Sequence, residues 1–129
     1  MQGLRSPTAS AHPLVVALHC SGGSSRQWRA LAERLEGRAT FFAPDLYGTA
    51  ETGHWHGGHA FRLADEAAPL SATIGGWDGP VHLIGHSYGG ALALHLASMR
   101  PARIASLILY EPTAFHLSLI HISEPTRPY

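Results

Sequence analysis

Short apolar runs alternate along this chain with longer segments in which apolar positions recur at helical spacing. Apolar runs of four to seven residues are typical of strands that are buried on both faces of a sheet. They predict four strands, at residues 13–18, 39–43, 81–84 and 104–110. The segments between them predict three helices, at residues 27–35, 60–74 and 91–100.

Strands that alternate with helices imply right-handed crossovers and a parallel sheet that is covered on both faces. The predicted fold is therefore an α/β three-layer sandwich with a mostly parallel sheet. In such sheets ligands bind beyond the carboxyl ends of the strands. Four segments fall at those ends, namely residues 19–23, 45–48 and 85–90 and Glu111.

Size and composition narrow the class of protein. A chain of 129 residues forms one domain at most, and 45% hydrophobic with 14% charged residues indicates a globular chain. Its formal net charge of zero gives no electrostatic case for binding nucleic acid or an anionic membrane. The single Cys20 excludes an internal disulfide. No apolar run approaches a membrane helix, and Met1–Arg5 lacks the apolar stretch of a signal peptide, so we expect a cytoplasmic protein.

The segment Gly85-His86-Ser87-Tyr88-Gly89-Gly90 joins the third predicted strand to the third predicted helix. The order strand, Gly-x-Ser-x-Gly, helix is the context of a nucleophile elbow. Gly85 and Gly89 supply small neighbours on either side of the serine, since a Cβ would clash in so tight a turn. Ser87 is therefore the candidate nucleophile, with its hydroxyl above the N-terminus of the next helix.

Residues 13–116 resemble the first catalytic half of a member of the alpha/beta-hydrolase superfamily. Four blocks carry the resemblance in the family's order, with Trp28 after the first of them: residues 19–23, 44–48, 85–90 and 101–104. Cys20 stands where the family usually has glycine, which affects the expected conformation of that loop. The resemblance implies an incomplete alpha/beta-hydrolase fold, with residues 1–116 as a partial domain.

The resemblance also implies roles for single residues. Ser87 resembles the nucleophile, and the backbone N–H groups of Tyr88 and Ser21 resemble the oxyanion hole. A serine nucleophile also needs a histidine base and a carboxylate, and in this fold both follow the serine along the chain. The residues available after Ser87 are Glu111, Glu124, His95, His116 and His121. His95 is expected to face away from the serine, so we expect the acid and the histidine beyond the fourth strand.

Residues 117–127 resemble a translated sequencing adapter. We interpret residues 117–129 as a non-native tail, so that His121 and Glu124 are not catalytic; the alternative is an ordinary C-terminal segment. On this hypothesis the chain is a fragment that stops before the triad acid and histidine, and it should be inactive alone.

Several other residues invite a functional interpretation. His54, His56 and His59 have the spacing of metal ligands, but no second cluster of ligands lies nearby in the sequence, so we expect a loop that shapes substrate entry and no metal. Asp45 is interpreted as a turn or cap residue, with an acid at the active-site rim as the alternative. Glu111 is interpreted as structural, with the triad acid as the alternative.

Two further residues are not expected to be catalytic: His86, directly before Ser87, and Cys20, in the loop after the first predicted strand. His86 is expected to pack into the sheet and not to act as the base, and Cys20 has no base paired with it. The three tryptophans are expected to pack in the core or under loops: Trp28, Trp55 and Trp77.

Together these features predict a serine hydrolase that acts on a small-molecule ester, thioester, lactone or amide through an acyl-enzyme, without a cofactor. Two alternatives remain open. One keeps the fold and changes the chemistry to that of an acyltransferase or a cofactor-free haloperoxidase. The other is a non-catalytic binding protein with the alpha/beta-hydrolase fold. A dehalogenase normally has aspartate where Ser87 stands, which argues against that activity. The sequence identifies neither the substrate nor the oligomeric state.

Overall fold

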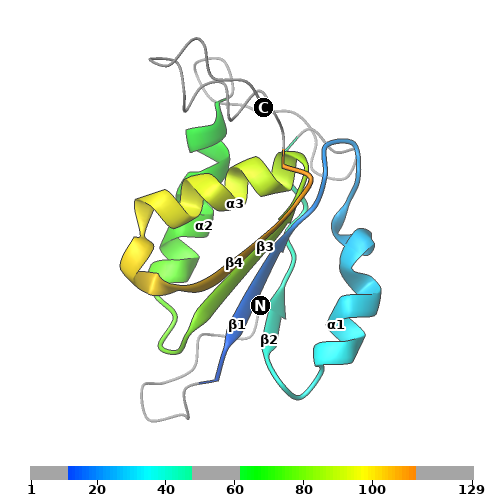
Figure 1. Cartoon of the computed structure of the whole chain (residues 1–129), viewed down its shortest axis with the longest axis vertical. Coiled ribbons are helices and arrows are strands. Elements are labelled where there is room, and N and C mark those ends of the chain that lie inside the picture. The colour runs from blue at the N-terminus through cyan, green and yellow to red at the C-terminus, as the bar shows by residue number, and fades with distance from the viewer. Residues whose placement is uncertain (1–11, 48–61, 113–129) are drawn as a thin grey trace.

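The computed structural model describes residues 12–47 and 62–112 of the chain (Figure 1). Its elements follow one another in the order β1 (Leu14–Leu18), a 3₁₀ turn (Ser25–Trp28), α1 (Arg29–Leu35), β2 (Thr40–Phe42), α2 (Leu63–Gly75), β3 (Val81–His86), α3 (Tyr88–Met99), a 3₁₀ turn (Pro101–Arg103) and β4 (Ile104–Tyr110).

The four strands of the described residues form one parallel sheet in the order β2-β1-β3-β4. The chain passes from β1 outward to β2 and then returns to β3 on the other side of β1. The strand order therefore reverses between β1 and β3, and a crevice at such a switch point is where open parallel sheets bind ligands. The last paired residues of these two strands are Leu18 and Gly85.

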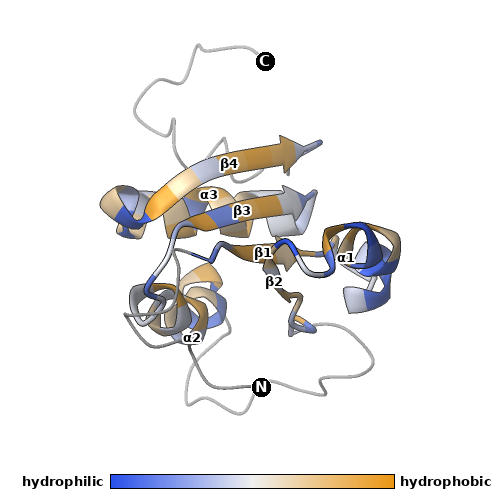
Figure 2. Ribbon diagram, turned by 90° about the horizontal axis from the view of Figure 1, so that it is seen from below, coloured by the Kyte–Doolittle hydropathy of each residue, from blue (hydrophilic) through white to orange (hydrophobic). Residues whose placement is uncertain are grey.

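The hydrophobic core lies between the sheet and the two helices α2 and α3. Figure 1 shows these helices together on one side of the sheet and α1 on the other. The core is built from alternate residues of β1 and β3 and from the inner faces of the helices, among them Leu14, Val16, Leu18, Leu83, Leu70, Ile74, Leu92 and Leu96. Figure 2 shows apolar residues concentrated along the strands, whereas α1 carries both hydrophilic and hydrophobic residues. None of the α1 residues is fully buried, and Trp28 just before the helix anchors it at 8% exposure.

All four predicted strands are present, and the predicted α/β fold with a parallel sheet between helices is confirmed. The boundaries differ mainly at the elbow. The third strand continues two residues beyond the predicted end to His86, and α3 starts at Tyr88. Hydrophobic pattern alone could not place these ends, because the intervening residues are small or polar. The second predicted helix begins at Leu63 in the described residues, and its first two predicted positions, 60 and 61, lie outside them.

No helix in the described ranges has the length and apolar character needed to cross a membrane. The proposed boundary between residues 116 and 117, and the tail that follows it, lie outside the described residues.

Candidate active site

Ser87 occupies the sharp turn between β3 and α3. Its backbone has φ 57° and ψ −116°, a conformation that a residue with a Cβ rarely adopts. The turn is fixed by backbone hydrogen bonds: the Ser87 N–H donates to the Tyr110 carbonyl at 3.0 Å, and the Ser87 carbonyl accepts from Gly90 N–H at 2.8 Å. The surrounding backbone thus holds this serine in a strained conformation, as the elbow hypothesis requires.

The two glycines that flank the serine are required by close backbone packing. A Cβ on Gly85 would lie within 3.0 Å of the Gly89 carbonyl, and a Cβ on Gly89 would lie within 3.0 Å of the Leu18 carbonyl. A Cβ on Gly90 would lie 3.1 Å from the Cα of Pro112, a tight but less severe contact. The sequence-based prediction that small neighbours are needed on both sides of the serine is therefore confirmed.

The two backbone amides that the sequence predicts for an oxyanion hole follow the carboxyl ends of the neighbouring strands β1 and β3. Tyr88 is the first residue of α3, so its N–H has no partner within the helix and lies at the positive end of the helix dipole. Ser21 is exposed in the turn that follows β1, where Gly23 N–H donates to the Cys20 carbonyl at 3.0 Å. Because β1 and β3 are neighbours, both loops leave the sheet at the switch point.

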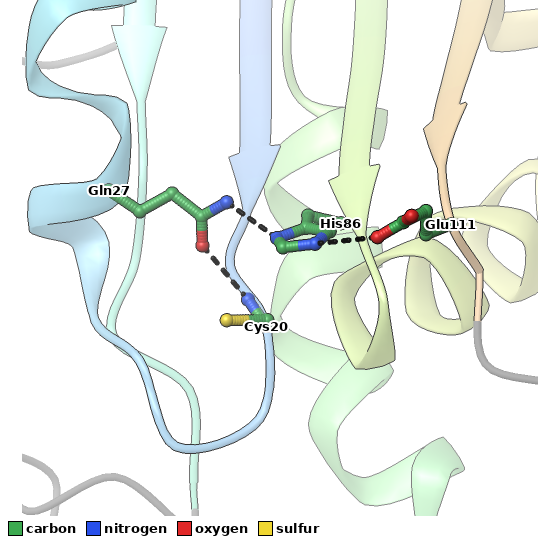
Figure 3. A network of polar contacts seen from close by, with 4 residues as sticks. All are labelled: Cys20, Gln27, His86 and Glu111. Carbon is green, nitrogen blue, oxygen red and sulfur yellow. Dashed lines mark hydrogen bonds and ion pairs between the residues drawn. The ribbon is translucent and has the colours of Figure 1, made fainter.

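A chain of polar contacts links the loop after β1 to the ends of β3 and β4 (Figure 3). The Gln27 side chain accepts a hydrogen bond from the Cys20 N–H at 3.1 Å and contacts His86 Nδ1 through its Nε2 at 2.8 Å. His86 Nε2 lies 3.8 Å from Glu111 Oε1, and the His86 ring packs against Tyr110 with the centroids 4.8 Å apart. Both nitrogens of His86 therefore face groups other than Ser87.

Glu111 directly follows β4 in a left-handed conformation with φ 47°, and its side chain is 74% exposed. Its carboxylate faces His86, which is the residue before the candidate nucleophile. The described contacts give Glu111 a structural partner and do not connect it to a histidine that could serve Ser87.

His19 is buried at 1% exposure between the loops that follow β1 and β2. Its Nε2 accepts a hydrogen bond from the Leu46 N–H at 3.0 Å, and its Nδ1 lies 2.7 Å from the Cys20 carbonyl. A backbone N–H can only donate and a carbonyl can only accept, so His19 is neutral with its proton on Nδ1. This side chain holds the two loops together.

Glu66 is a buried carboxylate in contact with the elbow, and the sequence patterns did not predict it as a residue of the site. It is 5% exposed and accepts hydrogen bonds from the Tyr88 hydroxyl and from the Tyr47 N–H, each at 3.0 Å. Burial raises the pKa of Glu66, and burial together with the nearby Glu66 charge raises the pKa of Tyr88. A signal was present: Glu66 falls three residues after Leu63 and four before Leu70, on the apolar face of α2.

Asp45 caps the first helical turn. Its Oδ1 accepts the Ser25 N–H at 2.8 Å, and this hydrogen bond lowers the pKa of the Asp45 carboxyl. The Ser24 hydroxyl accepts a hydrogen bond from the N–H of Arg26, the residue after Ser25 in the turn, at 3.2 Å. The interpretation of Asp45 as a cap residue is confirmed, although it caps a turn twenty residues earlier in the chain rather than its own loop.

Trp28 and Trp77 are buried at 8% and 3% exposure, as predicted. The described residues contain no group of three His, Cys, Asp or Glu side chains that would hold a metal. His95 lies on α3, and its carbonyl accepts the Ser98 hydroxyl. The remaining candidates lie outside the described residues: His54, Trp55, His56, His59, His116, His121 and Glu124.

Comparison with known proteins gives one family. A family model described as "alpha/beta hydrolase fold" matches residues 13–128. A lipase, LipV, from Mycobacterium tuberculosis is 35% identical over 99 residues, which cover 76% of this chain and 36% of the lipase. A haloalkane dehalogenase from Mesorhizobium japonicum is 33% identical over 100 residues, which cover 77% of this chain and 32% of the dehalogenase.

Among solved structures, a thioesterase domain from the curacin biosynthetic pathway matches with a TM-score of 0.68 and 28% identity, over 96% of this chain and 49% of that domain. The chain spans about a third of the length of the two curated relatives above.

Proposed function

The chain belongs to the alpha/beta hydrolase fold family, and we propose that it is the nucleophile-bearing part of a serine hydrolase that cleaves a small-molecule ester, thioester, lactone or amide. The observation that supports this most strongly is the conformation of Ser87, with φ 57° between β3 and α3. Glycine would adopt this positive φ without strain, so the presence of a strained serine here supports a functional role for its side chain.

In the proposed reaction the Ser87 hydroxyl oxygen attacks the substrate carbonyl carbon. A histidine takes the hydroxyl proton and then transfers it to the leaving group, which leaves an acyl-enzyme. Water, activated by the same histidine, hydrolyses the acyl-enzyme and regenerates the serine. The Tyr88 and Ser21 amides bind the oxyanion, and the loss of one such donor typically lowers the rate by about 10²–10³-fold.

The proposal places the histidine and its carboxylate beyond residue 116. His86 is engaged by Gln27 and Glu111 through its two nitrogens, which supports a base from elsewhere in the chain. The 129-residue chain alone is then expected to turn over very little substrate, since the oxyanion site and substrate binding without the triad give about 10³–10⁴-fold over water.

Two relatives carry different chemistries, a lipase and a haloalkane dehalogenase. Ser87 favours acyl transfer, because an alkyl halide is displaced through a carboxylate nucleophile in that class of reaction. The strained conformation of Ser87 favours a catalytic role over that of a non-catalytic binding protein with this fold.

The decisive experiment is to label the protein encoded by the complete open reading frame with a fluorophosphonate probe, which phosphonylates an activated serine. We expect the protein to be labelled and Ser87→Ala to abolish both labelling and ester hydrolysis. Ser98→Ala, which removes an exposed hydroxyl from the same helix, is the control and should label as the unchanged protein does. Absence of labelling in the complete protein, or labelling that survives Ser87→Ala, would overturn the proposal.

A further inference from the structure

We propose that Gln27 is a positioning residue for the oxyanion site: its side-chain amide fixes the loop that carries the Ser21 N–H against the elbow that carries Ser87. This inference rests on the proposed function. Gln27 lies in the 3₁₀ turn before α1, and its side chain reaches the ends of both β1 and β3 (Figure 3).

The contacts determine which way the amide of Gln27 points. The Cys20 N–H can only donate, so it must face Gln27 Oε1, at 3.1 Å. Gln27 Nε2 then donates to His86 Nδ1 at 2.8 Å, which requires that Nδ1 carries no proton. His86 is left with its proton on Nε2, the nitrogen that faces the Glu111 carboxylate. Each donor in this network therefore faces an acceptor on the next residue, in the order Cys20, Gln27, His86 and Glu111.

The base of the Gln27 side chain is held rigidly. Its own N–H donates to the Ser24 carbonyl at 3.1 Å, and the next residue, Trp28, is buried. The turn is capped from a separate loop by Asp45, which accepts the Ser25 N–H. A side chain on such a base acts as a fixed spacer between the two groups that it contacts.

The position of this spacer explains why it bears on catalysis. The backbone ladder between β1 and β3 ends at the pair Leu18 and Gly85. Beyond that pair, Gln27 makes the next link, from Cys20 to His86. Cys20 immediately precedes Ser21, and His86 immediately precedes Ser87. Gln27 therefore links the residue before the Ser21 amide to the residue before the site of attack, and it adds to the packing of Gly89 on the Leu18 carbonyl.

A role in oxyanion positioning predicts a specific kinetic effect. Hydrogen bonds to the oxyanion strengthen in the transition state, so a misplaced donor lowers kcat and leaves KM nearly unchanged. In the complete protein, Gln27→Met keeps the length of the side chain and removes both hydrogen bonds. We expect kcat to fall about 10- to 100-fold, less than or comparable to the full loss of a donor, with KM within about twofold.

Gln27→Glu tests the polarity of the network. A carboxylate still accepts the Cys20 N–H, but its second oxygen can face His86 Nδ1 only when that nitrogen is protonated. In the unchanged protein that nitrogen carries no proton, so the link to His86 is lost and kcat should fall about as much as in Gln27→Met, with KM again nearly unchanged. Arg29→Met, an exposed substitution on the adjacent helix, is the control and should change neither parameter.

A spectroscopic measurement keeps the proposal falsifiable if Gln27→Met fails to fold. In the unchanged protein, ¹⁵N chemical shifts should show His86 with its proton on Nε2, and the Cys20 amide should exchange slowly with solvent. A proton on His86 Nδ1, or a kcat of Gln27→Met equal to that of the unchanged protein while Ser87→Ala is inactive, would overturn the role of Gln27 alone. Activity that survives Ser87→Ala would overturn the proposed function and this role with it.

Discussion

Gly89, in the first turn of α3, packs directly on the carbonyl oxygen of Leu18, the last residue of β1. The helix that follows the candidate nucleophile therefore touches the point at which the neighbouring strand ends. No side chain fits between them, since a Cβ on Gly89 would lie within 3.0 Å of both the Leu18 and His19 carbonyl oxygens. This contact brings the elbow and the loop after β1 close together. Backbone N–H groups of both segments can therefore reach the same carbonyl oxygen of a bound substrate.

Gly89→Ala should destabilise the protein strongly, because the new methyl group meets backbone that cannot rotate away. We expect a loss of about 3 kcal/mol in the free energy of unfolding, at the upper end of overpacking effects. Gly22→Ala is the control: a Cβ there meets nothing within 4 Å, and its φ of +80° costs about 1 kcal/mol. Denaturant unfolding of both variants checks this, and equal losses would show that the contact with Leu18 is not the cause.

Much of the fold could be predicted from local signals. Local sequence patterns predict β4 from the apolar run Ile104–Tyr110. They also predict that α3 ends shortly before Pro101, because proline cannot continue a helix. The elbow could be predicted because its requirement is local, a serine between two glycines at a strand-to-helix junction. Gly37, just after the end of α1, is a local signal of the same kind, since its φ of +82° is one that glycine adopts without strain.

The supporting contacts of the site could not be predicted in this way. Gln27 contacts His86 across 59 residues of sequence, and Glu66 contacts Tyr88 across 22. Such pairs leave no periodic pattern, because each is made by one side chain that happens to reach a neighbouring element. Glu66 alone gave a hint, as a carboxylate on the apolar face of α2, and this kind of mismatch identifies a buried polar group without identifying its partner.

Glu66→Gln should make the protein more stable than the unchanged protein at neutral pH, and this gain should disappear in acid. Burial raises the pKa of Glu66 above its ordinary value of 4.5, so the native state binds more protons than the unfolded state above that pH. The contribution of Glu66 is therefore fully present below about pH 4.5 and declines as the pH rises through its native pKa. Glutamine mimics the protonated acid, since its oxygen accepts the Tyr47 N–H and its nitrogen donates to the Tyr88 oxygen.

Thermal unfolding of the two proteins between about pH 4 and pH 8 tests this sign. The difference in melting temperature should grow with pH in favour of Glu66→Gln and vanish near pH 4. Glu33→Gln on α1, an exposed carboxylate, is the control and should show no such trend. A melting temperature of Glu66→Gln that falls further below the unchanged protein as the pH rises would mean that the ionised carboxylate stabilises the fold.

Asp45→Ala should weaken the start of the first helix, because the Ser25 N–H loses its acceptor. The expected cost is about 1 kcal/mol at neutral pH, the usual value for a lost cap. The pKa of Asp45 is lowered from 3.8, so its contribution is present above that pH and is lost as the pH falls through the native pKa. Asp45→Asn keeps an acceptor without a charge. It should retain most of the stability and lose this acid dependence, and an equal loss in both variants would assign the effect to charge instead.

β4 should make the isolated 129-residue chain associate. Within the described residues β4 pairs only with β3, so its outer edge presents unpaired backbone groups, and such an edge is a template for another strand. Leu107 and Leu109 pack against the core, whereas Ile108 and Tyr110 are 54% and 58% exposed. The exposed apolar side chains and the open edge lie on the same strand, which favours the stacking of two copies through β4.

Ile108→Lys places a charge on this edge and should shift the chain from oligomers towards monomer in analytical ultracentrifugation at equal concentration. Met99→Lys is the matched control, since Met99 is 46% exposed but lies on α3 and not on the edge strand. Charge alone would improve both variants equally, whereas edge pairing predicts an effect at Ile108 only. A monodisperse monomer of the unchanged chain would contradict the prediction directly, because an open apolar edge of this kind should not stay unpaired at high concentration.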